Sequence, residues 1–319
     1  MRKFVQLFLS RPEFSALIMI IVVLIGFSLY SPYFMTPTNI RVVLGIIPEL
    51  GLVALGVSIL MIAGEFDLSV GSVLALTPMV AFTTMAGGLD PTLAILLSLL
   101  VALGIGFINA QITLRFNIPS FITTLGMLFI ARSLTVVISG GSPPPFPADA
   151  PAAIFVEPFA LFRMSLIWYA GLAILLGLML HMSNFGNWVF ATGGYRPAAR
   201  DMGIDVFKVK TACFMLCSFL AGFAGLIQAF RLRSALPSAG VGLELEAIAA
   251  SVIGGMALTG GIGSVLGAVI GASLIRVIDN GLVMARVDAN WFNLAIGTLT
   301  IVAVIFNTWI RERARRMRT

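Results

Sequence analysis

Ten apolar stretches, separated by glycine, proline or charged residues, constrain the fold of this chain more than any other feature. Only a helix satisfies its own backbone groups in hydrocarbon, and about 20 apolar residues are needed to cross it. With 11% charged residues, the chain carries less than half the charge of a typical soluble protein. We therefore expect an all-α polytopic membrane protein, with one transmembrane domain over residues 1–319 and a helical core at 14–310. The stretches are Ser15–Tyr30, Val42–Ala63, Val70–Gly87, Thr92–Leu114, Phe121–Ser139, Ser165–Met182, Val209–Phe230, Leu245–Leu258, Ile262–Asn280 and Trp291–Ile310.

The distribution of basic residues predicts the orientation of these helices. If the N-terminus lies inside, 13 of the 20 Lys and Arg residues fall on cytoplasmic pieces and 5 on outer pieces, with 2 inside helices. This excess on one side fits the positive-inside rule with both termini cytoplasmic. It also accounts for the net charge of +6 without a nucleic-acid partner. The outer loop 140–164, which contains GGSPPPFPADAPAA, is expected to be stiff and largely extended, and residues 184–210 form the longest cytoplasmic loop.

Two carboxylates, Glu65 and Asp67, stand in the segment AGEFDLSVG between two uncharged apolar stretches. Asp67 or Ser69 could cap the next helix by accepting hydrogen bonds from its free N–H groups. The same polar groups could instead line a path for a polar solute, because an unpaired carboxylate does not persist beside hydrocarbon. Both roles are compatible. The candidates for such a path are Glu65, Asp67, Ser69, Asn109, Thr123 and Asn280.

The chemistry that is missing limits the function classes. None of the three lysines follows a glycine as a phosphate-binding loop requires, so this chain is not itself an ATPase. It has one histidine and no nucleophile motif, which argues against an enzyme, and we expect no catalytic residue, metal or cofactor. Cys213 and Cys217 are expected to be buried apolar residues. An ion-coupled carrier, which would need ionisable residues inside the membrane, remains an alternative, but most of the candidates lie at the ends of apolar stretches, where water can reach them, and this weakens it.

The cytoplasmic loop contains a candidate docking helix. Pro197 suits the first turn of a helix and Gly203 suits its end, and the small Ala198 and Ala199 would let another surface approach closely. An ordinary basic loop that obeys the positive-inside rule is the alternative. The candidate residues are Arg196, Pro197, Ala198, Ala199, Arg200, Asp201, Met202, Gly203 and Ile204.

The glycines between Glu244 and Gly271 predict close helix packing or an irregular segment. Gly267 and Gly271 have the G-x-x-x-G spacing that brings membrane helices together backbone to backbone. The pairs Gly254–Gly255 and Gly260–Gly261 would also permit a broken or re-entrant helix.

Four stretches, in order, resemble the permease family of bacterial ABC importers for monosaccharides, the ribose, xylose and autoinducer-2 type. They are Gly64–Ser72, Asn117–Leu134, Ala191–Ile204 and Glu244–Gly271, the last followed by Asp279–Leu282. The matches run from about Gly51 to Asn307. The chain departs from the family pattern at Glu65, Ala110 and Tyr195, which leaves the sugar open.

The resemblance implies a ten-helix fold similar to that of the vitamin B12-type importers, located in the bacterial inner membrane. It implies an ATPase partner, usually two fused nucleotide-binding halves, which binds ATP and contacts Arg196–Ile204. It also implies a second permease subunit, identical or paralogous, and a periplasmic sugar-binding protein. A permease for nucleosides or another small polar solute is the alternative within the wider family.

Overall fold

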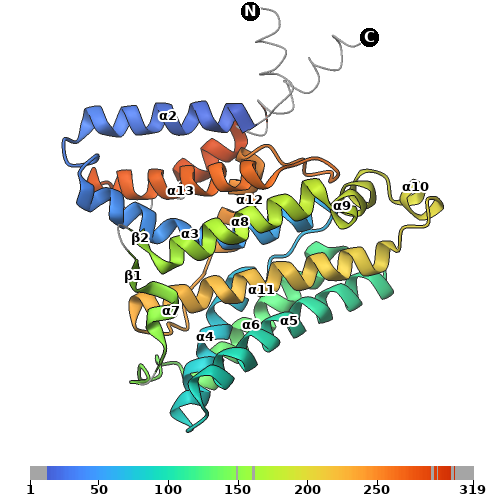
Figure 1. The fold of residues 1–319 in the computed structure, drawn as a ribbon, viewed down its shortest axis with the longest axis horizontal. Helices are drawn as coiled ribbons and strands as arrows, with labels where there is room; N and C mark the ends of the chain where they lie inside the picture. Colours follow the sequence, from blue (N-terminus) through green and yellow to red (C-terminus); the bar gives the residue numbers. More distant parts are fainter. Residues whose placement is uncertain are drawn as a thin grey trace, which may run out of the picture.

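The computed structural model describes residues 13–302, apart from 149, 160, 161, 289, 290 and 293, together with residue 305. Figure 1 shows a helical body in which the axes of most long helices are roughly aligned. A further helical stretch covers 294–302. The elements are α2 Glu13–Tyr30, α3 Pro37–Ile62, α4 Val70–Ala86, α5 Pro91–Arg115, α6 Ser120–Ser139, α7 Ala152–Val156, β1 Pro158–Phe159, β2 Phe162–Arg163, α8 Met164–Met182, α9 Asn184–Gly194, α10 Arg196–Asp201, α11 Val206–Leu232, α12 Leu243–Ile253 and α13 Val265–Met284.

Short polar side chains start several helices where the sequence leaves an apolar stretch. The Asp90 carboxylate accepts hydrogen bonds from the N–H groups of Thr92 and Leu93 at 2.9 and 3.1 Å and so caps α5. Ser183 caps α9, Asp205 caps α11 and Ser264 caps α13 in the same way. These caps satisfy N–H groups that a helix cannot bond internally.

The centre of the molecule is formed by α3 and α11. These two helices are mostly buried, whereas α6 and α8 leave most of their surface exposed. One side of the pair packs against α5 and α4, and the other packs against α13 and α12 (Figure 1). The small hairpin β1–β2 and α7 lie at one end of the molecule, and α9 and α10 lie at the other (Figure 1).

Six described helices, α3, α5, α6, α8, α11 and α13, are long and apolar enough to cross a membrane. Two further predicted stretches form shorter apolar helices, Ala16–Tyr30 and Val70–Ala86. Only part of the tenth stretch, Trp291–Ile310, lies within the described residues. These six helices support a multi-pass membrane protein.

The eighth predicted span, Leu245–Leu258, is corrected by the structure. The helix here, α12, has 11 residues. At about 1.5 Å per residue it is roughly half as long as a bilayer core is thick. Gly255, with φ +94°, turns the chain away, and the following irregular backbone is covered by protein from Gly254 to Ala257. The ninth span is α13, which begins at Val265 rather than Ile262.

The predicted close packing of the glycine-rich stretch is confirmed. A Cβ on Gly267 would collide with the carbonyl oxygen of Gly254, and one on Gly271 with that of Ala250. These contacts join α13 to α12 and to the residue that ends it. The outer loop is only partly as predicted: residues 143–147 have no regular secondary structure, but Ala152–Val156 forms a short helix and a hairpin follows.

Candidate functional site

The segment between α3 and α4 forms a buried polar cluster around Asp67, which is fully buried. Its carboxylate accepts hydrogen bonds from the N–H and the hydroxyl of Ser69, at 2.8 and 2.6 Å. Asn109 of α5 donates to Ser69 Oγ at 3.0 Å and to Asp67 at 3.4 Å, and Ser218 of α11 donates to Asp67 at 3.5 Å. We call these four residues the Asp67 cluster. It ties the segment to two long helices at once.

The backbone of the same segment is held by the first turns of α6. Phe66 N–H donates to Ser120 Oγ at 3.1 Å, and Leu68 N–H donates to Thr124 Oγ1 at 3.0 Å. The irregular segment is therefore supplied with partners by protein, as backbone at membrane depth requires. The capping role predicted for Asp67 is supported, because it satisfies the Ser69 N–H at the entry to α4. Ser69 itself makes no side-chain cap and donates to Asp67 instead.

Glu65 forms a separate ion pair with Lys210. Lys210 Nζ lies 2.6 Å from Glu65 Oε1, and both side chains are largely buried. The sequence count placed Lys210 in the cytoplasmic loop, but it lies in the first turns of α11. Glu65, which departs from the family pattern, thus has a partner of opposite charge within the chain.

The six path candidates do not form one group in this structure. Asp67, Ser69 and Asn109 meet in the Asp67 cluster, where none has an exposed surface. Thr123 lies on α6 with a buried hydroxyl that has no hydrogen-bond partner among the described residues. Asn280 lies on α13 and exchanges hydrogen bonds of 2.9 and 3.0 Å with Asn39 of α3. Their role in a path stays a prediction, and the structural role of the cluster is the one the geometry supports.

The cytoplasmic loop is more ordered than predicted. Residues 184–210 contain two helices, α9 and α10, and the start of α11. Pro197 lies in the first turn of α10, and Gly203 follows the helix with φ +81°, as their types predict. The predicted alanine patch needs correction, because Ala199 is buried against its own chain and only Ala198 is partly exposed.

The exposed surface of α10 and its flanks carries charged and large apolar side chains. Arg200 and Asp201 are exposed, and so are Tyr195 and Met202 on either side of the helix. A concave space of about 690 Å³ separates α10 from the end of α5. It is lined by Leu114, Arg115, Asn117, Arg196, Pro197, Arg200 and Asp201.

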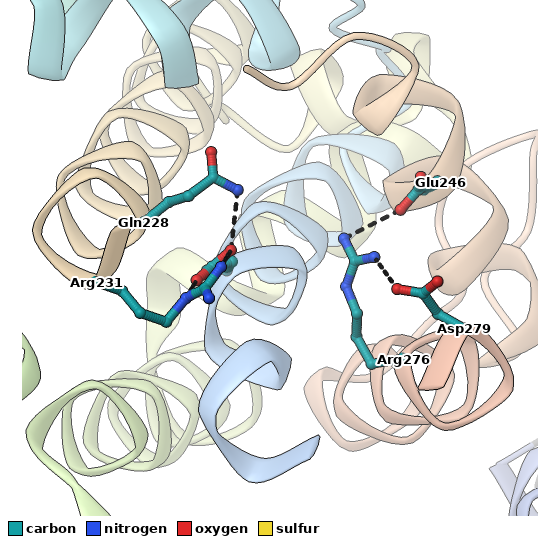
Figure 2. Close-up of polar contacts among 6 residues, drawn as sticks. Gln228, Arg231, Glu246, Arg276 and Asp279 are labelled. Atoms are coloured by element: carbon teal, nitrogen blue, oxygen red, sulfur yellow. Dashed lines mark hydrogen bonds and ion pairs between the residues drawn. The ribbon is translucent and has the colours of Figure 1, made fainter. Parts of the chain in front are cut away.

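The sequence analysis did not predict which residues pair in two charged clusters, one on each side of α3. On α11, Arg231 pairs with Glu49 of α3, and Gln228 donates to the same carboxylate at 2.9 Å. On α13, Arg276 lies 3.1 Å from Glu246 of α12 and 3.4 Å from Asp279. Figure 2 shows Gln228 and Arg231 converging on one carboxylate, and Arg276 lying between Glu246 and Asp279.

A sequence signal for the first cluster exists. Gln228 and Arg231 are three residues apart, which places them on one face of α11. Arg231 was assigned to an outer loop because the predicted helix ended at Phe230, whereas α11 continues to Leu232. The predicted burial of Cys213 and Cys217 is confirmed, and both are free.

The chain is also similar in sequence to known proteins. Residues 39–304 match the family described as the branched-chain amino acid transport system / permease component. The chain belongs to this permease family. It is 34% identical to the ribose import permease protein RbsC of Escherichia coli (strain K12) over 298 residues, 92% of each chain. It is 29% identical to the xylose/arabinose import permease protein XylH of Sulfolobus acidocaldarius, over 97% of this chain and 88% of the relative.

A third relative is the autoinducer 2 import system permease protein LsrC of Yersinia enterocolitica, 31% identical over 83% of this chain and 74% of its own. No solved structure is significantly similar to the chain. The family resemblance expected from the four stretches is confirmed.

The Asp67 cluster makes a prediction for this permease. Asp67→Ala would leave the Ser69 N–H and hydroxyl without their acceptor, while the Asn109 amide would keep only Ser69 Oγ, so we expect the free energy of unfolding to fall by about 2 kcal/mol. Asp67→Asn keeps an acceptor oxygen and should cost clearly less. Thermal unfolding in detergent, followed by a thiol-reactive dye that labels the buried Cys213 and Cys217 on unfolding, measures both variants. Equal midpoints for the two variants would contradict the acceptor role.

Proposed function

We propose that this chain is the membrane subunit of an ATP-driven importer that moves a monosaccharide across the bacterial inner membrane. The observation that supports this most strongly is the relationship to sugar import permeases over nearly the whole length of both chains, with the ribose permease at 92% coverage on each side. The xylose/arabinose permease supports the same solute class at 97% coverage of this chain. The chain translocates, and a partner hydrolyses ATP.

The complete importer would contain a second permease subunit, an ATPase with two nucleotide-binding halves and a periplasmic sugar-binding protein. We further propose a ten-helix arrangement similar to the vitamin B12-type importers, with both termini cytoplasmic. The coupling element would be α10 with the residues that follow it, Arg196–Ile204. Its exposed charged side chains and its position at one end of the molecule support a docking role (Figure 1).

A rigid link connects this element to the centre of the permease. Backbone atoms of α9 lie against the end of α3, since a Cβ on Gly193 would collide with the carbonyl oxygen of Ile62. The segment that follows Ile62 leads directly into the Asp67 cluster. A displacement of α10 by the ATPase would therefore reach the buried polar segment without passing through flexible side chains.

Uptake by the reconstituted importer tests the proposal. The tagged chain is purified from native membranes with its partners, placed in liposomes with ATP on the ATPase side and given radiolabelled ribose, xylose, arabinose or a nucleoside. We expect uptake of at least one pentose to exceed the ATP-free control by about tenfold. Uptake of the nucleoside alone would favour the other solute class, and uptake driven by an ion gradient without any ATPase would establish the ion-coupled carrier.

A further inference from the structure

The space beside α10 joins two parts of the chain that are far apart in sequence. Its lining comes from α10 and from the end of α5 with the turn that follows it, Arg115 and Asn117. Phe116 in that turn is also exposed. The turn is held in a defined shape, because Asn117 adopts the left-handed conformation with φ +56° and α6 begins three residues later. We call this space the notch: α10 forms one of its walls, and the end of α5 with the turn after it forms the other.

The notch has an excess of positive charge that the described chain does not neutralise. Three arginines line it, Arg115, Arg196 and Arg200, but only one carboxylate, Asp201. Within residues 13–302, with the gaps given above, none of these three guanidinium groups forms an ion pair. Within the part of the chain that the structure describes, the Nε of Arg196 has no hydrogen-bond acceptor, but the chain itself covers this atom. The excess positive charge of the notch is therefore what a partner of opposite charge from outside the chain can meet.

We propose that the notch between α10 and the α5–α6 turn receives an acidic side chain of the ATPase subunit, so that the docking surface is bipartite. The inference rests on the proposed function and specifies the partner's chemistry. Arginine fits a carboxylate in two-point geometry, and aromatic residues, methionine and arginine are the types enriched at protein interfaces. Tyr195, Phe116 and Met202 are each exposed and each next in sequence to a residue that lines the notch.

The position of the notch favours a protein over an anionic phospholipid. In Figure 1, α10 lies at the right-hand end of the molecule, past the ends of α5 and α11. The lipid is nevertheless the natural competitor, because both ligands carry negative charge, and the experiment separates the two.

The decisive variant is Arg115→Glu, which lies outside α10. In purified complexes we expect its dissociation constant for the co-purified ATPase to rise about tenfold or more, because one charge-assisted contact is replaced by repulsion. Lys208→Glu is the matched control: it makes the same charge change on an exposed residue near α10 but outside the notch, and it should change the constant by less than about threefold. Arg115→Gln should give an intermediate value.

Crosslinking supplies a measurement that does not depend on affinity. Both native cysteines are buried, so Phe116→Cys places the reactive thiol in the α5–α6 turn. A maleimide–diazirine reagent on this residue should form an adduct with the ATPase, whereas Val137→Cys near the far end of α6 should not.

The outcomes distinguish this inference from the proposed function. If the unaltered chain co-purifies with an ATPase but Arg115→Glu binds it equally well and Phe116→Cys forms no adduct, the bipartite surface is wrong and the importer stands. Retention of fewer anionic phospholipids by Arg115→Glu in native mass spectrometry, with unchanged ATPase affinity, would identify a headgroup site and also overturn it. If the unaltered chain binds no ATPase, the proposed function fails with it.

Discussion

Arg231→Met is expected to lower the free energy of unfolding by about 3 kcal/mol. The Glu49 carboxylate is nearly fully buried, and Arg231 is its only cationic partner within the described residues. The substitution leaves the carboxylate with a neutral donor, Gln228, at 2.9 Å. Removing one member of a buried pair is costly because the remaining charge stays in a poorly solvated site. Thermal and denaturant unfolding in detergent, followed by cysteine labelling, measures the loss.

Two further variants separate the ion pair from a general effect of losing an arginine. Arg233→Met removes a neighbouring arginine that is exposed, and it should change stability by less than about 0.5 kcal/mol. The double variant Glu49→Leu/Arg231→Met removes both charges and should recover most of the stability, since an apolar pair of similar volume can replace a buried ion pair. A double variant as unstable as Arg231→Met alone would contradict the unpaired-charge explanation.

The main helices could be predicted from the sequence because the signal is local. Length, apolar composition and breakers locate α5, α6, α8 and α11 to within three residues, whereas α3 begins at Pro37, before the predicted Val42. The same signal failed at α12, whose composition resembles that of a spanning helix. Its end depends on how Gly254 packs against Gly267 of α13 and on the positive φ of Gly255, and a residue-by-residue reading of apolar character does not contain that information.

The site was predictable only where neighbours in sequence are neighbours in space. Asp67 and Ser69 are two residues apart, and their interaction follows from that spacing. Glu49 and Arg231 are 182 positions apart, so each residue could be recognised as unusual while its partner could not be named. Ala199 shows a third limit: residue type identifies a small side chain, but only the packing of α10 decides that it faces inward.

Gly193→Ala is expected to impair both stability and coupling. A Cβ at this position would collide with the carbonyl oxygen of Ile62, and it cannot be accommodated by turning a flexible side chain because the opposing atoms are backbone. Overpacking of this kind lowers the free energy of unfolding by about 1–3 kcal/mol. We expect a loss at the upper end of this range, because the added Cβ would meet backbone atoms. Gly194→Ala is a matched control in the same helix, because its Cβ would meet only Gly261 Cα at 4.0 Å.

The expected loss of transport follows from the three segments that contact one another at Gly193. The end of α3, the helix α9 and the irregular segment after α12 touch backbone to backbone there, and Gly261 N–H donates to the Ile62 carbonyl at 2.8 Å. Moving α9 away from Ile62 would loosen the connection between α10 and the Asp67 cluster. In liposomes containing the complete importer, we expect Gly193→Ala to reduce ATP-driven uptake about tenfold while the ATPase still binds and hydrolyses ATP. Gly194→Ala should retain uptake. Full uptake by Gly193→Ala would show that motion reaches the buried segment by another route, and equal losses in both variants would place the defect in α9 itself rather than in its contact with α3.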